Sequence, residues 1–242
     1  IAARAVLAWR RPGVEPIATP ALAVAPREES LRAGAATVRL CTCPFSRAMP
    51  RFPLFSQFPL HERLLKALES LSFSEPTPVQ AAAIPKALEG HDLRVTAQTG
   101  SGKTAAFLLP LLHRLLAEDK PRSLARALIL LPTRELAQQT LKEVERFAQF
   151  TFIKACLITG GEDFKVQGAR LRKNPEIIIG TPGRLLEQRN AGNLPLQDIE
   201  VLVLDEADRM LDMGFADDVL ALANACPAER QTLLFSATHS GA

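Results

Sequence analysis

Ala97-Gln98-Thr99-Gly100-Ser101-Gly102-Lys103-Thr104 is the stretch that decides the fold of this 242-residue chain. It follows a short apolar run at residues 93–96 and precedes the apolar start of a helix at Ala105. A glycine-rich loop between a strand and a helix can direct backbone N–H groups at phosphate oxygens. Lys103 can then reach the β- and γ-phosphates of ATP, and the Thr104 hydroxyl can ligate Mg²⁺. The stretch predicts a phosphate-binding loop, although Ala97 replaces the usual first glycine. The alternative is a tight turn with a surface lysine.

A second stretch lies about a hundred residues further on. The apolar run Val201–Leu204 predicts a buried strand of a parallel sheet, and it is followed by Asp205, Glu206 and Asp208. Ligands of open α/β sheets bind beyond the carboxyl ends of the strands. There Asp205 can hold Mg²⁺, and Glu206 can accept a proton from the water that attacks the γ-phosphate. A solvated cluster of charges is the alternative, which the phosphate-binding loop upstream disfavours.

Apolar runs alternate with helical segments along the chain, which predicts an α/β fold with a doubly wound, mainly parallel sheet. We expect strands at residues 93–96, 127–131, 153–159, 176–180, 201–204 and 231–235. We expect helices at residues 60–71, 79–88, 103–118, 135–149, 162–173 and 215–224, and one that ends near residue 190.

Three loops at the expected strand ends share a pattern: Pro132-Thr133-Arg134, Gly160-Gly161 and Thr181-Pro182-Gly183-Arg184. Each can offer a helix N-terminus, a hydroxyl or an arginine to a phosphate group. Turn and N-cap chemistry would explain any one of them alone. Three of them beside an ATP site favour a track for a single RNA strand.

Taken together, these motifs make the sequence resemble the DEAD-box ATP-dependent RNA helicases, and among them the bacterial members. The resemblance covers roughly residues 52–242, and the family usually has alanine at the position of Ala97. The motifs that carry it follow in the family's order: Phe55, Glu75-Pro76-Thr77-Pro78-Val79-Gln80, residues 97–104, Pro132 to Ala137, Gly160-Gly161, Thr181 to Arg184, Asp205 to Asp208, and Ser236-Ala237-Thr238. One departure is Ser72, where the family usually has glycine. The resemblance implies a P-loop NTPase domain of the RecA-like type that couples Mg²⁺-dependent ATP hydrolysis to RNA duplex unwinding or remodelling.

The resemblance also implies roles for single residues. Phe55 is expected to stack on adenine and Gln80 to hydrogen-bond the adenine edge, because an amide can donate and accept at once. Residues 97–104 are expected to bind the nucleotide, with Lys103, Asp205 and Glu206 as the catalytic set. The three strand-end loops would grip the RNA backbone, while Asp208, Ser236 and Thr238 would couple nucleotide state to RNA. The structural alternatives are a hydrophobic staple at Phe55 and a plain strand-end turn at residues 236–238.

Residues 1–50 differ from the rest of the chain and are expected to be a disordered or non-native extension to the domain at 51–242. The first 48 residues contain twelve Ala, seven Arg and five Pro, and no helical or strand period persists. Three interpretations stay open: a basic arm that binds RNA, an organellar transit peptide, or an over-extended reading frame with Met49 as the natural start. The third is favoured, because the resemblance begins within a few residues of Met49.

Charge and cysteine usage narrow the class of protein. The net charge is +3, of which the first 48 residues carry +4 and the remainder −1. RNA binding must therefore come from local placement of arginines and backbone donors. The four cysteines form no CxxC pair, and no apolar run could cross a bilayer, so we expect a reducing, cytoplasmic setting and a monomer. RNA is the expected partner, and ribosome-assembly or RNA-decay proteins are left open.

Two rival functions are weighed against this interpretation. A different P-loop motor, such as a DNA translocase, is disfavoured by Gln80 with Phe55 and by Ala207 within the acidic tetrad. A non-enzymatic RNA clamp is disfavoured by the intact Lys103 and Glu206. The family also carries a second RecA-like domain with an arginine finger, which is expected beyond residue 242, so the chain alone is expected to be weakly active.

Overall fold

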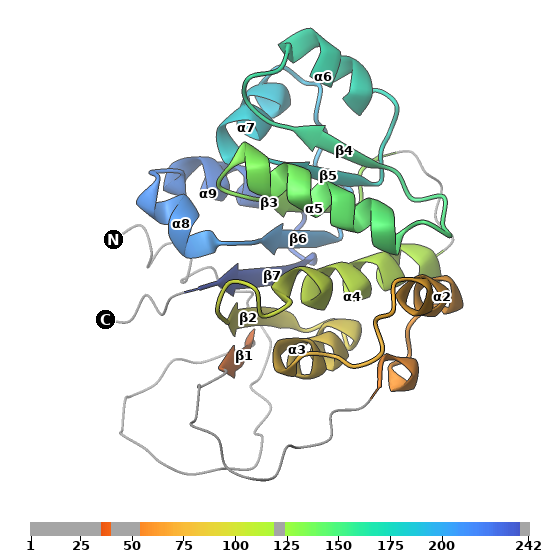
Figure 1. The fold of residues 1–242 in the computed structure, drawn as a ribbon. Helices are drawn as coiled ribbons and strands as arrows, with labels where there is room; N and C mark the ends of the chain where they lie inside the picture. The colour runs from red at the N-terminus through yellow and green to blue at the C-terminus, as the bar shows by residue number, and fades with distance from the viewer. Residues whose placement is uncertain (1–34, 40–53, 119–123, 238–242) are drawn as a thin grey trace, which may run out of the picture.

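The computed structural model describes residues 35–39, 54–118 and 124–237. Its strands form one parallel sheet in the order β1-β2-β7-β6-β3-β5-β4 (Figure 1). The strands are β1 (Ala35–Arg39), β2 (Asp92–Thr96), β3 (Ala127–Leu130), β4 (Ala155–Ile158), β5 (Ile177–Gly180), β6 (Val201–Leu204) and β7 (Gln231–Ser236). The helices are η1 (Phe55–Gln57), α2 (Glu62–Ser70), α3 (Pro78–Leu88), α4 (Lys103–Ala117), α5 (Arg134–Phe147), α6 (Phe164–Leu171), α7 (Pro182–Asn190), α8 (Ala207–Asp212) and α9 (Ala216–Ala225).

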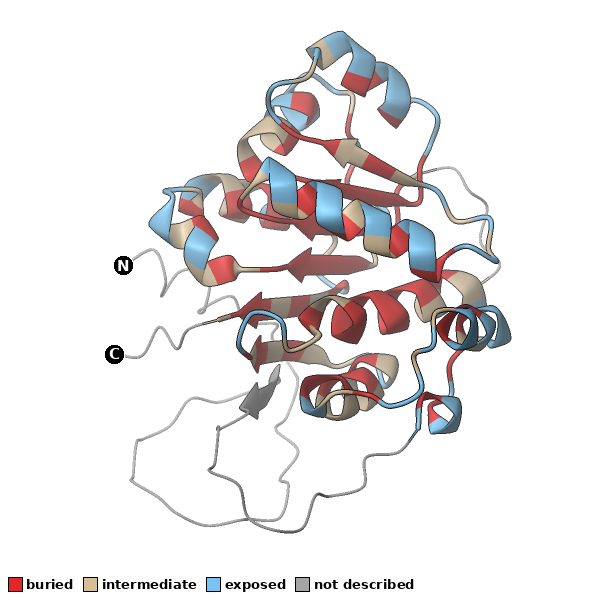
Figure 2. Ribbon diagram, viewed as in Figure 1, coloured by how far each residue is buried: buried red, intermediate tan, exposed pale blue. Residues whose placement is uncertain are grey.

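The central strands are buried on both faces, which explains why they read as continuous apolar runs (Figure 2). Successive side chains of a strand point to opposite faces of the sheet. In β3, Ala127 and Ile129 join one hydrophobic core, whereas Leu128 and Leu130 join the other. The first core includes α2, α3, α4 and α5, and the second includes α7, α8 and α9. The sheet is therefore the middle of three layers.

Helix α4 fixes the position of the glycine-rich loop that precedes it. Ten of its residues are buried, from Lys103 to Leu115. The ring of Phe107 packs on the ring of Phe235 in β7, with 5.4 Å between their centroids. Because the helix is held on nearly every side, its first residue has little freedom to move away from the sheet.

The doubly wound parallel sheet is confirmed, and every expected strand and helix is present. The differences lie at element boundaries. Strand β4 begins at Ala155 and not at residue 153, and the short helix α8 directly after the acidic residues is new.

The extension also differs from expectation over five residues. Ala35–Arg39 form β1, which pairs in parallel with β2 in the register Ala35↔Asp92 to Arg39↔Thr96. The remaining predictions for the extension, including a start at Met49, fall outside the described residues. In the described part of the chain, no helix is long and apolar enough to cross a membrane.

Candidate functional site

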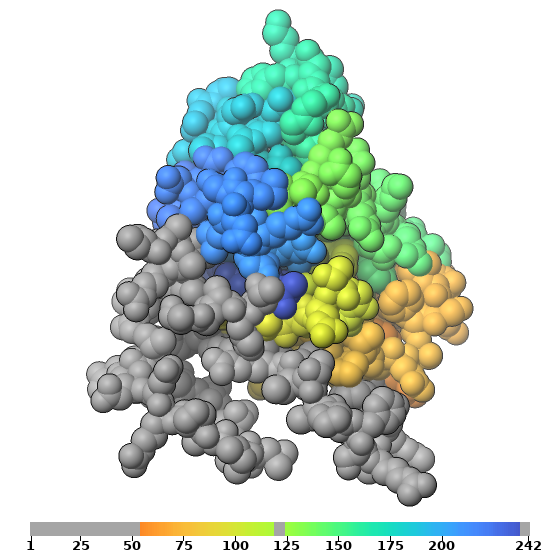
Figure 3. Space-filling model, turned by 60° about the vertical axis from the view of Figure 1, so that its left-hand side comes forward, coloured from red at the N-terminus to blue at the C-terminus, as the bar shows by residue number. Residues whose placement is uncertain are grey.

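The glycine-rich loop joins β2 to α4 at the carboxyl end of the sheet. Gly100 and Gly102 have φ angles of +81° and +91°, a backbone region that favours glycine. A Cβ on Gly102 would lie 2.5 Å from Nε2 of Gln80, so a side chain there would displace the Gln80 amide from the loop. Figure 3 looks onto this rim, where the yellow segment that holds the loop lies beside the blue segments after β6.

Gln80 and Thr77 hold this loop from the start of α3. The Thr77 hydroxyl donates to the carbonyl of Ser101 at 2.8 Å, and Nε2 of Gln80 donates to the carbonyl of Gly102 at 3.1 Å. Oε1 of Gln80 accepts from the backbone N–H of Thr77 at 2.8 Å, which completes a capping box. The amide predicted to face adenine is thus bonded to the loop. The role of Thr77 was missed, although the Thr-x-x-Gln spacing could have indicated it.

Phe55 lies in the hydrophobic core and not on the surface. Its side chain is 2% exposed, and its ring packs against Phe58 and Phe73 at centroid distances of 6.0 and 6.3 Å. Phe55 shares this core with Leu64 and Leu68 of α2, the helix onto which the structural alternative places it. Stacking on adenine stays a prediction, and it requires the ring to become accessible.

Lys103 has the surroundings of a phosphate ligand. Lys103 is only 7% exposed, and its Nζ has no hydrogen-bond partner in the part of the chain that the structure describes. The Ser101 hydroxyl is buried and unpartnered in the same way. Buried polar groups without partners are costly, so a cation and a hydroxyl left open beside a glycine loop fit an anionic ligand.

Asp205 is the buried carboxylate of the site. Burial raises its pKa to about 6, a shift that the nearby Lys103 charge and a hydrogen bond from the backbone N–H of Glu206 partly offset. That N–H lies 3.0 Å from Oδ1 of Asp205. A carboxylate this poorly solvated is suited to a cation, and Thr104 stands one residue beyond Lys103. One carboxylate and one hydroxyl fit Mg²⁺, which commonly keeps most of its ligands as phosphate oxygens and water.

Glu206 adopts a strained backbone conformation at the start of α8. Its φ and ψ of 51° and 47° are left-handed, which is uncommon for a residue with a side chain. Its Oε2 lies 3.4 Å from Nη1 of Arg209, one turn into the helix. Oδ1 of Asp205 accepts from the N–H of Glu206, whereas Oε2 of Glu206 accepts from Arg209, so the two carboxylates have different partners.

Backbone contacts connect the loop and the acidic residues to the end of β7. The N–H of Ala97 donates to the carbonyl of Ser236 at 3.1 Å. The N–H of Ala237 donates to Oδ2 of Asp208 at 3.2 Å. The side chain of Asp208 is therefore in contact with the backbone of Ala237, while Thr238 lies outside the described residues. The coupling role of Asp208, Ser236 and Thr238 stays a prediction.

The three strand-end loops lie together, because β3, β5 and β4 are neighbours in the sheet. Thr133 caps α5, and Nη1 of Arg134 lies 2.9 Å from where a Cβ of Gly161 would be. Thr181 precedes Pro182 at the start of α7, and its side chain makes no capping hydrogen bond. Its hydroxyl is thus not used to cap α7.

Arg184 braces two of these loops. Its Nη1 donates to the carbonyl of Glu162 at 2.8 Å and to Oε1 of Gln167 at 3.2 Å, and its Nε pairs with Glu187 at 2.8 Å. The guanidinium predicted to bind phosphate is therefore engaged within the protein. Glu162 and Gln167 were missed as its partners, because no sequence spacing indicates a contact between two different loops.

Comparison with known proteins identifies what this arrangement is similar to. The family model described as "DEAD/DEAH box helicase" matches residues 77–242. A protein named "Probable ATP-dependent RNA helicase ddx27" from Dictyostelium discoideum is 54% identical over 187 residues, which are 77% of this chain and 24% of that protein. "ATP-dependent RNA helicase CshA" from Listeria monocytogenes is 48% identical over 184 residues, 76% of this chain and 35% of that protein.

A solved structure agrees with the fold. The crystal structure of a DEAD box protein from the hyperthermophile Methanococcus jannaschii has a TM-score of 0.71 and 39% identity, covering 76% of this chain and 50% of that one. The chain thus spans half or less of these relatives. The expected bacterial likeness is not confirmed, since the Dictyostelium protein matches at a higher identity than the Listeria protein.

Proposed function

Because the chain belongs to the DEAD/DEAH box helicase family, we propose that it is the ATP-binding and hydrolysing part of an RNA helicase. The observation that carries this proposal is the buried Nζ of Lys103, which has no hydrogen-bond partner among the described residues and lies on the same rim as Asp205 and Glu206. The relatives are named ATP-dependent RNA helicases, which supports ATP as the nucleotide and RNA as the polymer.

In this mechanism each residue has one task. Lys103 and the N–H groups of the glycine loop bind the phosphates, because a buried ammonium forms strong, charge-assisted hydrogen bonds. Asp205 and Thr104 would hold Mg²⁺, which would supply positive charge beside the phosphates when it is bound. Glu206 accepts the proton of the attacking water. Gln80 faces adenine only after its amide exchanges a bond with the loop for one with the base, which would link base recognition to loop geometry.

RNA binding is proposed for the rim formed by the loops at 132–134, 160–161 and 181–184. Arg134 and the hydroxyl of Thr181, which does not cap α7, are the groups best placed for direct phosphate contacts, whereas Arg184 supports the loops. Backbone contacts of this kind position a strand without reading its sequence. Asp208 and the backbone at 236–237 provide the route by which nucleotide binding alters this rim. Magnesium, the RNA track and a second RecA-like domain that completes the ATP site all belong to the proposal.

The test separates binding from hydrolysis. Lys103→Ala should lose ATP affinity by roughly 10- to 100-fold, the range for hydrogen bonds to charged groups. Glu206→Gln should keep ATP affinity and lose turnover, because an amide cannot take the proton. Binding is measured by titration of the chain, and RNA-stimulated turnover in a protein that also carries a second RecA-like domain. Lys142→Ala, on an exposed face of α5, is the matched control. Normal turnover of Glu206→Gln would refute the assignment.

A further inference from the structure

A second surface with the features of a single-strand binding site lies on the opposite rim of the sheet. The strand arrowheads in Figure 1 point toward the glycine loop, and α2 lies at the other end, beside the end of α5. Here Phe150 and Phe152, in the loop after α5, are 37% and 69% exposed. We define the aromatic patch as these two residues with Arg63, Lys66 and Lys154.

Each ring of the patch has a cation from α2 over its face. Cζ of Arg63 lies 5.7 Å from the centroid of Phe152, and Nζ of Lys66 lies 4.7 Å from the centroid of Phe150. The helix is further tied to the loop by Nε2 of Gln149, which donates to Oγ of Ser70 at 2.8 Å. Two surface rings that a neighbouring helix holds in place form an organised surface, unlike exposed apolar residues that occur singly.

The backbone after α5 presents these groups to solvent. Residues 152–154 precede β4 in the chain, and Ile153 packs against the hydrophobic core. Because side chains alternate along extended backbone, Phe152 and Lys154 are both exposed. Neither Arg63, Lys66 nor Lys154 forms an ion pair with a carboxylate anywhere in the described ranges. The patch thus combines aromatic surface with three positive charges that form no ion pair among the described residues.

We infer that the aromatic patch binds a stretch of single-stranded RNA that lies outside the proposed track. Proteins that bind single strands combine positive charge with aromatic rings on which bases stack. Bases also stack on the guanidinium plane of arginine, so Arg63 can serve either the base or the phosphate. Glu62 and Glu69 line a hollow of about 710 Å³ on α2 together with Lys66, which thus borders both this hollow and the aromatic patch. A protein partner would also suit exposed aromatics, but the cations over both rings favour a polyanion.

The inference rests on the proposed function only in its choice of RNA. If it holds, one strand can contact both rims, and its affinity should grow with length beyond what the track alone can bind. A uridine oligomer of about six nucleotides therefore probes the track alone, and one of about twenty nucleotides probes the track together with the aromatic patch.

The experiment maps where RNA contacts the chain and how length matters. Photocrosslinking of the longer oligomer, followed by mass spectrometry, should identify the peptide with Phe150 and Phe152. In Phe152→Ala, the affinity gained by the longer oligomer should shrink about fivefold or more, the lower end for one base–aromatic stack. Phe152→Trp should retain the gain, and Phe152→Leu should lose it, because leucine keeps apolar surface without a ring. Lys66→Gln should reduce the salt dependence, whereas Lys142→Gln should not.

The outcomes distinguish this inference from the proposed function. Crosslinks confined to the loops at 132–134, 160–161 and 181–184 would overturn the inference and leave the track standing. An unchanged length dependence in Phe152→Ala would also overturn it, and would point to a structural or protein-binding patch. Absence of crosslinks at either rim would contradict RNA binding by the chain as a whole.

Discussion

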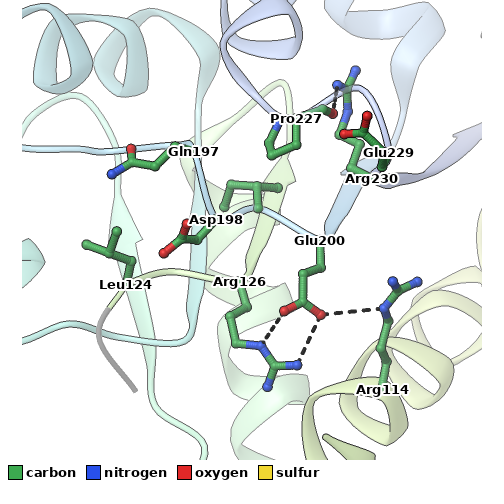
Figure 4. A pocket seen from close by; sticks show the side chains of 10 residues that line it. Arg114, Leu124, Arg126, Gln197, Asp198, Glu200, Pro227, Glu229 and Arg230 are labelled. Carbon is green, nitrogen blue, oxygen red and sulfur yellow. Dashed lines mark hydrogen bonds and ion pairs between the residues drawn. The ribbon is translucent and has the colours of Figure 1, made fainter. Parts of the chain in front are cut away.

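Charged side chains are buried at both rims of the sheet, but their hydrogen-bond partners differ. At the amino rim, Arg126 is 7% exposed, and its guanidinium donates to Glu200 at 2.8 and 3.0 Å and to the carbonyl of Leu115 at 3.1 Å. Figure 4 shows this cluster, with Arg114 as a further partner of Glu200 at 3.6 Å. At the carboxyl rim, Nζ of Lys103 has no hydrogen-bond partner among the described residues, and the pKa of Asp205 is raised.

This difference shows which buried charges are structural and which await a ligand. A hollow of about 450 Å³ lies beside the Arg126 cluster, yet Glu200 there already pairs with Arg126 and Arg114 (Figure 4). Neither this hollow nor the larger one of about 710 Å³ on α2 is lined by a residue of the glycine loop, so cavity size does not locate the candidate site.

The candidate site is identified instead by a whole cationic group without a hydrogen bond to the described residues, as at Nζ of Lys103. Single nitrogens of Arg114 and Arg230 at the amino rim also lack such a hydrogen bond, but Arg114 pairs with Glu200 and Arg230 donates to the carbonyl of Pro227.

The largest expected effect on stability follows from removing Arg126 from the ion-pair cluster at the amino rim. Arg126→Ala leaves the carboxylate of Glu200, whose side chain is 15% exposed, without its two-pronged partner. We expect the free energy of unfolding to fall by about 3–5 kcal/mol, the cost of removing one member of a buried pair. Urea denaturation measures this loss, with Arg146→Ala on exposed α5 as the control, where little change is expected. A loss below about 1 kcal/mol would mean that the cluster is no more than a surface pair.

Removing the buried carboxylate of the other rim should have the opposite sign. The folded pKa of Asp205 is about 6, above the ordinary 3.8, so its ionised form destabilises the fold at neutral pH. Asp205→Asn should therefore raise the free energy of unfolding at pH 8 by about 1–3 kcal/mol, given a shift of about two pKa units. The gain should fade as pH drops from about 6 to 4, where aspartate becomes neutral.

Metal-free denaturation at pH 8 and pH 4 measures this change. Asp198→Asn, on an exposed loop at the amino rim, is the control and should show no comparable gain. If Asp205→Asn were destabilising at pH 8, Asp205 would be a structural group and not one that awaits a cation.

A smaller effect is expected from backbone strain, which occurs at both rims. Ser72, at the end of α2, has a φ of 59°, and Glu206 has a φ of 51°. Ser72→Gly should stabilise the fold by about 1 kcal/mol, because glycine adopts the left-handed region without a steric penalty. Glu69→Gly, with ordinary helical geometry, should instead cost about 1 kcal/mol.

Thermal denaturation compares the two glycine variants, and Glu206→Gly extends the comparison to the candidate site. It should gain stability as Ser72→Gly does but lose turnover, because the carboxylate that accepts the proton is removed. Equal turnover would refute the assignment of Glu206 as the base.

The sequence predicted the sheet and the location of the site because both rest on local signals. Alternating apolar runs specify strands, and the glycine loop and acidic residues follow strands directly. Contacts between distant loops could not be predicted, as Arg184 with Glu162 and Gln80 with Gly102 illustrate. The burial of Phe55 also depends on rings from two other segments, Phe58 and Phe73. Side-chain roles inferred from motifs are therefore less secure than the motifs' positions.

The smallest expected effect concerns His113, on the same helix as Lys103 but toward the amino rim. Its Nδ1 accepts from the backbone N–H of His61 at 3.0 Å, and burial, with the nearby His61, lowers its pKa. The unfolded chain therefore binds this proton more readily, so stability is highest above pH 6.5 and is lost as pH falls below it. The raised pKa of Asp205 gives the opposite dependence of stability on pH. The effect of His113 is therefore measured in the Asp205→Asn variant.

In that background, His113→Gln should flatten the fall in unfolding free energy between pH 7 and 5, because glutamine can still accept from His61 but does not titrate. Imidazole chemical shifts of His113 and His61 identify which ring binds the proton. ATP affinity, measured in the Asp205-containing chain, should not follow the His113 titration, since its bond leads to α2 and not to the glycine loop. The contrary result would be an ATP affinity that falls as His113 binds its proton and recovers in His113→Gln. That result would mean that α4 couples the two rims of the sheet, so that they do not act independently.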